Sequence, residues 1–168
     1  INHDVKSIEY YLNKKFNNHK SLKNKKELIH FCATSEDINN IAYSLIYTDN
    51  RAVLSSELSK LLKKLASFEK KYANTQMLSR THGQKASPTT FGKEIKVFSS
   101  RLKKQITFMK SRKIFAKMNG AVGNYNAHYF VLPEIKWENE TKKFLKNIGL
   151  SQNKYTTQRN EPDSVEIL

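Results

Sequence analysis

The sequence predicts an all-α protein, built as a bundle of long helices. Apolar residues recur at helical spacing over several long stretches, and no alternating strand pattern of useful length competes with them. The interval between Gly92 and Gly120 contains neither glycine nor proline. We therefore expect long helices that pack lengthwise against one another.

The longest predicted helix lies in that interval. Its apolar positions, spaced by 4, 3, 4, 4 and 3 residues, are Phe91, Ile95, Phe98, Leu102, Ile106 and Met109. A helix over most of the interval would be about 40 Å long, at a rise of about 1.5 Å per residue. We expect it to start near Ser87-Pro88-Thr89, with the proline in its first turn.

Three further helices are predicted. The same periodicity runs from Ile38 to Ile46 and from Leu54 to Phe68. A shorter helix fits Glu138 to Ile148, with Gly149 as its C-terminal cap. Polar breaks at residues 31–40, 79–90 and 119–128 interrupt the helices.

Composition limits the class of protein without naming its function. The single cysteine, Cys32, excludes an intrachain disulfide and favours a reducing, cytoplasmic setting. No apolar run approaches the ~20 residues that a membrane-spanning helix needs. Thirty Lys plus Arg against fifteen Asp plus Glu give a net charge of +15. Such a charge attracts nucleic acid, anionic lipid, or phosphorylated and carboxylated substrates, and it does not choose between them.

The chain is expected to be one partial domain over residues 1–168, cut from a larger protein. It opens on Ile1 rather than methionine, and the polar cluster Asn2-His3-Asp4 follows at once. The length suits either one well-cored domain or a piece of a larger one.

The first polar break allows two interpretations. Thr34 and Asp37 have the spacing of a capping box, and Ser35 is a second candidate for the N-cap. Hydroxyl groups at a helix N-terminus can also help to hold a phosphate or carboxylate. The residues alone leave both interpretations open.

The second break contains the most reactive candidate, His82, followed by Gly83. A lone histidine is more often structural than catalytic, but a glycine turn lets a ligand approach closely, and an imidazole there can act as a general acid. The histidines show no metal-ligand spacing, and neither a serine-hydrolase elbow nor a phosphate loop is present. We expect no cofactor.

Five blocks of sequence together carry a family resemblance. They are "NHDVKSIEYYL" (2–12), "HFCATSEDINN" (30–40), "LSRTHGQKASPTTFGKE" (78–94), "MNGAVGNYNAH" (118–128) and "YTTQ" (155–158). In this order and spacing they resemble the bacterial-type adenylosuccinate lyase family of the fumarase/aspartase superfamily, over essentially the whole chain.

The resemblance implies the central helical domain of such a lyase. These enzymes eliminate fumarate from adenylosuccinate to give AMP, and from the succinyl-carboxamide ribotide SAICAR to give AICAR, in purine biosynthesis. The reaction is an anti β-elimination, in which His82 would be the general acid. The residues implied to bind the substrate are Asn2, His3, Asp4, Thr34, Ser35 and Gln158. Asp4, an anion itself, would orient His3 or accept from a nucleotide N–H or hydroxyl.

The sequence departs from the family in two places. The family base is a serine on a mobile Gly- and Ser-rich loop with a lysine, and no such stretch occurs here, so we expect the acid and part of the binding site without the base. After Gln158 the family pattern shifts, and residues 159–168 lack its histidine.

The resemblance also implies a homotetramer whose sites draw on several subunits, with a small-molecule substrate and neither nucleic acid nor membrane as a partner. Two alternatives remain. One is another superfamily lyase with a different succinyl or carboxylate substrate. The other is a basic helical nucleic-acid-binding module, suggested by the nine Lys or Arg between residues 93 and 117. That module would leave His82 and the first polar break unexplained.

Overall fold

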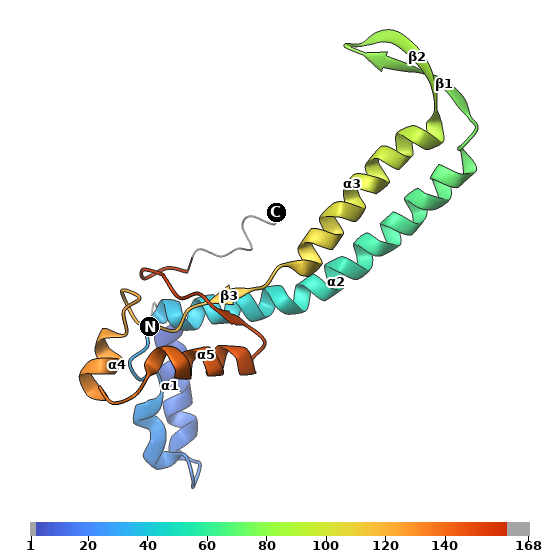
Figure 1. Ribbon diagram of the computed structural model, residues 1–168. Helices are drawn as coiled ribbons and strands as arrows, with labels where there is room; N and C mark the ends of the chain where they lie inside the picture. The colour runs from blue at the N-terminus through green and yellow to red at the C-terminus, as the bar shows by residue number, and fades with distance from the viewer. Residues whose placement is uncertain (1–2, 161–168) are drawn as a thin grey trace. The chain divides into compact units, whose positions relative to one another are not determined.

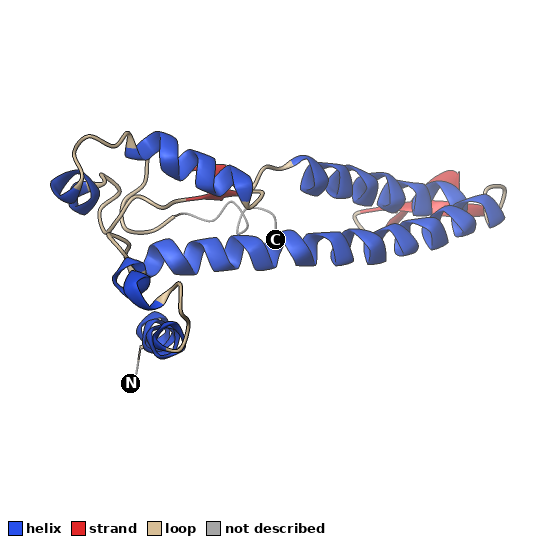
Figure 2. Cartoon of the chain, turned by 90° about the horizontal axis from the view of Figure 1, so that it is seen from below, coloured by secondary structure: helices blue, strands red, loops and turns tan. Residues whose placement is uncertain are grey.

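The computed structural model describes residues 3–160, and helices account for most of them (Figures 1 and 2). The predicted helical class is therefore confirmed. The elements in chain order are α1 (Asp4–Asn17), a 3-10 helix η1 (Lys23–Leu28), α2 (Ser35–Lys71), β1 (Gln76–Thr81), β2 (Gln84–Thr90), α3 (Phe91–Ser111), β3 (Phe115–Ala116), α4 (Asn126–Val131), α5 (Trp137–Asn147) and β4 (Ser151–Gln152). Among residues 3–160 no helix has both the length and the apolar character that a membrane span requires.

The chain forms two compact units. The first combines residues up to Thr48 with those from Lys113 onward, and the second is Asp49–Arg112. Helix α2 contributes its first fourteen residues, 35–48, to the first unit and the rest to the second. The expectation of one partial domain stays a prediction.

The core of the first unit lies where α2, α5 and the short sheet meet. Leu145, Ala116 and Leu150 form a buried cluster, and the predicted apolar face of α2 contributes Ile41 and Leu45 to it. Strands β3 and β4 pair in parallel within this region, with Phe115 opposite Ser151 and Ala116 opposite Gln152. Of the apolar positions predicted at residues 38–46, Ile41 and Leu45 therefore belong to the core, whereas Ala42 and Ile46 are exposed.

Helix α5 ends as the sequence predicts. Gly149 has a φ of +82° and its N–H donates to the carbonyl of Lys146, while the N–H of Leu150 donates to that of Leu145. These two bonds form a Schellman motif, in which a left-handed residue lets the chain satisfy the last carbonyls of a helix. Leu145 and Leu150, at its two ends, pack together in the core.

The second unit pairs α3 with residues 49–71 of α2. A Cβ atom at Gly92 would lie 2.7 Å from both the Cα of Ala73 and the carbonyl oxygen of Glu69, so only glycine permits this close approach. Farther along, the Arg51 guanidinium donates to the carbonyl of Arg112 at 2.7 Å. The helix predicted between Gly92 and Gly120 is present as α3, and it ends at Ser111.

The two helices of the second unit cover only part of their apolar faces. The predicted apolar positions that are buried or half-buried are Leu58, Leu62, Leu65, Ile95, Leu102, Ile106 and Met109. Those that stay exposed are Leu54, Leu61, Phe68, Phe91 and Phe98, the last with 64% of its surface accessible. Each helix thus has a second apolar face that its own unit leaves open.

The start of α3 differs from the prediction. Residues 87–89 belong to β2, and Pro88 lies opposite Leu78 of β1 in an antiparallel hairpin (Figure 1). The helix begins at Phe91, and the hydroxyl of Thr90 caps it by accepting from the N–H of Lys93 at 3.3 Å. The hairpin was missed because most of its residues are exposed, so no apolar alternation marks it.

Candidate active site

The first turn of α2 forms one of the two side-chain bonds of the predicted capping box. The N–H of Thr34 donates to the Asp37 carboxylate at 3.0 Å, and the N–H of Asp37 donates to the carbonyl of Thr34 at 3.0 Å. The second bond of the box is absent, since the Asp37 N–H donates to a carbonyl, and the hydroxyls of Thr34 and Ser35 form no hydrogen bond within residues 3–160. Both residues are only half-buried, so their hydroxyls remain available to a ligand.

Asp37 also forms an ion pair with Lys117, whose ammonium group lies 2.8 Å from its Oδ1. Both side chains are completely buried. The Asp37 carboxylate accepts further bonds from the N–H groups of Asn119 at 3.2 Å and Gly120 at 3.1 Å. The Lys117 ammonium group donates to the carbonyls of Gly120 at 2.8 Å and Gln158 at 2.9 Å.

The pair is fully hydrogen-bonded, as buried charges must be. All three ammonium protons of Lys117 have an acceptor, and each Asp37 oxygen accepts two bonds. Burying two charges is costly unless their remaining donors and acceptors are satisfied in this way. From the sequence, Asp37 was interpreted only as a helix cap and Lys117 only as part of a basic stretch. The one sequence feature that could have indicated a buried Lys117 is its position between two apolar residues, Ala116 and Met118.

Two asparagines extend the network. Asn40 accepts from the N–H of Lys117 at 2.9 Å and donates to its carbonyl at 3.1 Å, which holds the 117 backbone against α2. Asn119 donates its amide to the Thr156 hydroxyl at 2.8 Å. A Cβ at Gly123, where φ is +83°, would collide with the carbonyl of Thr156, so this approach requires glycine.

Gln158 is held by its backbone and exposes its side chain. Its carbonyl accepts from Lys117, as described above, while the residue itself is exposed. Next to it lies an open hollow of about 580 Å³, whose lining includes Gly123, Thr156 and Arg159. The network therefore brings the Gln158 segment to the first turn of α2, where Thr34 and Ser35 lie.

The N-terminus of α1 reaches the same helix. His3 is the N-cap of α1 and accepts from the N–H of Lys6 at 3.3 Å. The amide of Asn39 in α2 donates to Asp4 at 3.4 Å. His3 Nδ1 lies 3.5 Å from Asp4 Oδ1, which is long for a hydrogen bond, so orientation of His3 by Asp4 stays a prediction. Asn2 lies outside the described residues.

The loop that enters α2 contains a second imidazole, which sequence analysis did not single out. His30 and Cys32 both have positive φ values, +63° and +57°, in the left-handed region that disfavours residues with a Cβ. His30 Nε2 is buried without a hydrogen-bond partner in the described part of the chain. Its Nδ1 lies 3.5 Å from a carboxylate oxygen of Glu9. The sequence feature that could have drawn attention to His30 is its position as the first residue of the block at residues 30–40.

His82 occupies a different setting, in the second unit. With Gly83 it forms the two-residue turn between β1 and β2, and their φ values are +51° and +76°. Two successive positive φ values are typical of the type I′ turn that joins tight hairpins. The residue is exposed rather than packed among apolar side chains, so a ligand has access to its ring.

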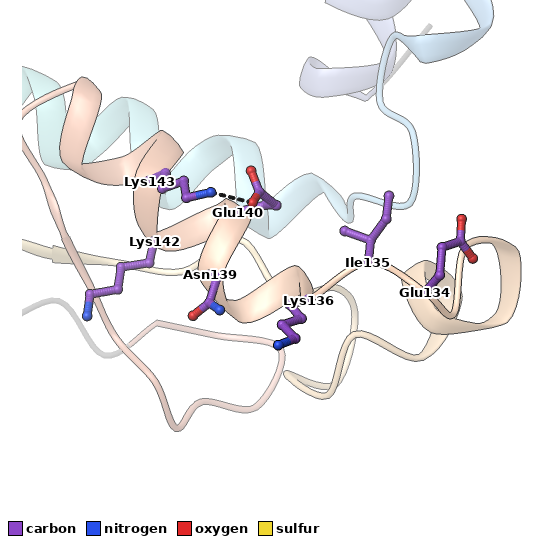
Figure 3. A pocket seen from close by; sticks show the side chains of 7 residues that line it. All are labelled: Glu134, Ile135, Lys136, Asn139, Glu140, Lys142 and Lys143. Atoms are coloured by element: carbon purple, nitrogen blue, oxygen red, sulfur yellow. Dashed lines mark hydrogen bonds and ion pairs between the residues drawn. The ribbon is translucent and has the colours of Figure 1, made fainter.

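A second hollow carries none of the predicted site residues. It lies over α5 and the segment before it, and is lined by Glu134, Ile135, Lys136, Asn139, Glu140, Lys142 and Lys143 (Figure 3). The ammonium group of Lys143 pairs with Glu140 at 2.6 Å. In the described range, no three His, Cys, Asp or Glu side chains are grouped as metal ligands.

Comparison with known proteins shows which proteins this chain is similar to. Adenylosuccinate lyase from Legionella pneumophila (strain Corby) is 46% identical over 165 residues, which are 98% of this chain and 36% of that protein. The enzyme of that name from Haemophilus influenzae (strain ATCC 51907 / DSM 11121 / KW20 / Rd) is 44% identical over 94% of this chain and 35% of its own length. The chain thus spans about a third of the length of these curated relatives.

Solved structures agree on the fold. A β-carboxy-cis,cis-muconate cycloisomerase from Acinetobacter calcoaceticus superposes with a TM-score of 0.71 and 23% identity, over 90% of this chain and 33% of that one. A fumarate lyase from Mesorhizobium gives 0.56 and 25%, over 71% of this chain and 34% of its own. The model of the family described as lyase matches residues 1–165. Since this match covers almost the whole sequence, the chain belongs to the lyase family, as its five blocks predicted.

Proposed function

We propose that the protein containing this chain eliminates fumarate from adenylosuccinate to give AMP, and from SAICAR to give AICAR, in the cytoplasm. The observation that carries the proposal is the 46% identity to an adenylosuccinate lyase over 98% of this chain. The similarity extends across both units, so it includes the segment with His82 and the network around Asp37.

In this proposal His82 is the general acid. Elimination leaves charge on the departing nitrogen, and an imidazolium within hydrogen-bond reach protonates it as the C–N bond breaks. The turn supports this role, because it leaves His82 exposed, where a substrate can reach it. A substrate with a phosphate and two carboxylates would itself favour the protonated ring.

The first unit supplies the binding groups. The Thr34 and Ser35 hydroxyls lie free at the positive end of α2, where a carboxylate or phosphate is stabilised. Gln158 adds an exposed amide, and His3, Asp4 and Asn2 complete the proposed set. Fixed donors of this kind also stabilise the carbanion that forms when the base removes the succinyl proton.

We further propose a homotetramer with sites shared between subunits. The apolar faces that α2 and α3 leave open in the second unit support it, because contiguous exposed apolar surface marks an interaction site. Lengthwise packing of these helices against those of other copies would bury Leu61, Phe68 and Phe98. Residues of one site can then come from different chains.

The test is release of fumarate from adenylosuccinate by the full-length protein carrying His82→Asn. Asn-Gly is the preferred pair for a type I′ turn, so this variant removes the imidazole and keeps the hairpin. We expect kcat to fall about 10²- to 10⁴-fold, the usual contribution of general acid catalysis. His19→Asn, at another exposed histidine, is the matched control and should turn over like wild type.

Two results would contradict the proposal. Wild-type rates in His82→Asn would remove His82 from the reaction. Turnover of another succinyl substrate, with none of adenylosuccinate or SAICAR, would place the protein elsewhere among the superfamily lyases.

A further inference from the structure

We propose that the buried Asp37–Lys117 ion pair is a positioning device, which sets the spacing between the start of α2 and the Gln158 segment. The inference rests on the proposed function, since these two places carry substrate-binding groups in that proposal. Neither Asp37 nor Lys117 can touch a ligand itself, because both side chains are completely buried.

The direction of the hydrogen bonds supports this role. Apart from the ion pair itself, every hydrogen bond made by the two side-chain charges joins them to a main-chain N–H or carbonyl group. Asp37 holds the N–H groups of Thr34, Asn119 and Gly120. Lys117 holds the carbonyls of Gly120 and Gln158.

The pair therefore fixes backbone positions rather than filling space. Apolar side chains of similar volume often replace a buried ion pair without loss of stability, so packing alone gives no reason for the charges. Residues 153–160, by contrast, lie in no helix or strand, and their place depends on such bonds. The Lys117 ammonium group is the hydrogen-bond partner that the structure shows for Gln158.

A second hydrogen bond near Gln158 should limit how far the loss of the Lys117 side chain is felt. The Asn119 amide holds the Thr156 hydroxyl at 2.8 Å independently of Lys117. Loss of the Lys117 side chain should therefore free Gln158 while Thr156 stays in place. The acid His82 belongs to the other unit, so a change at Lys117 should act on substrate binding more than on proton transfer.

The experiment compares Lys117→Met with wild type in the full-length protein, using adenylosuccinate. We expect KM to rise about tenfold or more and kcat to change less than about threefold, because the Gln158 carbonyl loses its bond to a charged donor. Amide hydrogen exchange should become faster in residues 157–160 and stay unchanged in α3. If Lys117→Met does not fold, Lys117→Gln, which keeps two donors, should show a smaller change of the same kind.

Leu145→Ala is the matched control, since Leu145 is equally buried in the same unit but bonds to neither segment. It should lower the melting temperature and leave KM within about twofold of wild type. An unchanged KM in a folded Lys117 variant, or an equal rise in Leu145→Ala, would overturn the positioning role. Failure of wild type to release fumarate from adenylosuccinate would instead refute the proposed function, and the exchange measurement would still decide whether Lys117 holds Gln158.

Discussion

The Asp37–Lys117 network and the His82 turn achieve placement in opposite ways. In the network, two buried charges and two asparagines hold three chain segments through many hydrogen bonds. At the turn, His82 is exposed, and the backbone of a two-residue connection determines its position. One region is fixed by side chains and the other by main-chain conformation.

The difference shows what each region can tolerate. Binding groups from separate segments keep their spacing only if something holds the segments together, which requires buried, satisfied polar contacts. A single reactive side chain on a tight turn needs only the turn. Substitutions in the network should therefore lower the free energy of unfolding strongly, and substitutions at the turn should lower it little. This holds whatever their effects on turnover.

The largest effect is expected from Asp37→Asn. It leaves the Lys117 ammonium group buried without an opposite charge, which costs about 3–5 kcal/mol of unfolding free energy in comparable cases. Urea unfolding followed by circular dichroism measures the change. Asp49→Asn, at an exposed position of the same helix, is the control and should stay within about 0.5 kcal/mol of wild type.

His82→Asn in the same assay should also stay within about 0.5 kcal/mol, because asparagine readily adopts a positive φ before glycine. A loss at His82 as large as that at Asp37 would end the distinction between the two regions.

The next prediction compares the loss of stability when alanine replaces each of two glycines that have a positive φ, Gly83 and Gly123. Gly83→Ala meets no atom within 4 Å and should cost about 1 kcal/mol, for backbone strain alone. Gly123→Ala adds a collision with the backbone carbonyl of Thr156, so we expect a loss of more than about 2 kcal/mol. Unfolding of both variants side by side measures the difference. Equal losses would mean that the Thr156 segment moves aside freely.

Local rules made much of the fold predictable. The bond between the Thr34 N–H and the Asp37 side chain, the Gly149 cap of α5 and the apolar spacing of α3 each depend on residues a few positions apart. The Lys117 interaction was beyond reach, because its partners Asp37 and Gln158 lie 80 and 41 positions away and nothing in the spacing links them. His82 was found as a candidate, but its hairpin was not, since exposed strands lack an alternating pattern.

The last predicted effect is a pH dependence of stability carried by His128, whose ring lies next to the network. The residue is 2% exposed, and its ring packs edge-on against Tyr125 and Trp137, with centroids 5.4 and 4.9 Å away. Burial lowers the pKa of His128 below its usual 6.5, although the charge of Asp37 opposes the shift. The ring also lies beside Gly120, whose N–H binds that carboxylate.

The sign follows from proton binding. Below about pH 6.5 the unfolded chain takes up a proton at His128 that the folded protein does not, so stability should fall with pH until the lowered pKa is reached. Each pH unit in that window is worth at most about 1.4 kcal/mol. Unfolding free energies at pH 7.5 and 5.5 should therefore differ more in wild type than in His128→Phe, which keeps the aromatic packing and cannot titrate, with an upper limit of about 1.4 kcal/mol on the extra difference. An identical pH dependence in the two proteins would show that the buried ring takes up its proton as readily in the folded state as in the unfolded one.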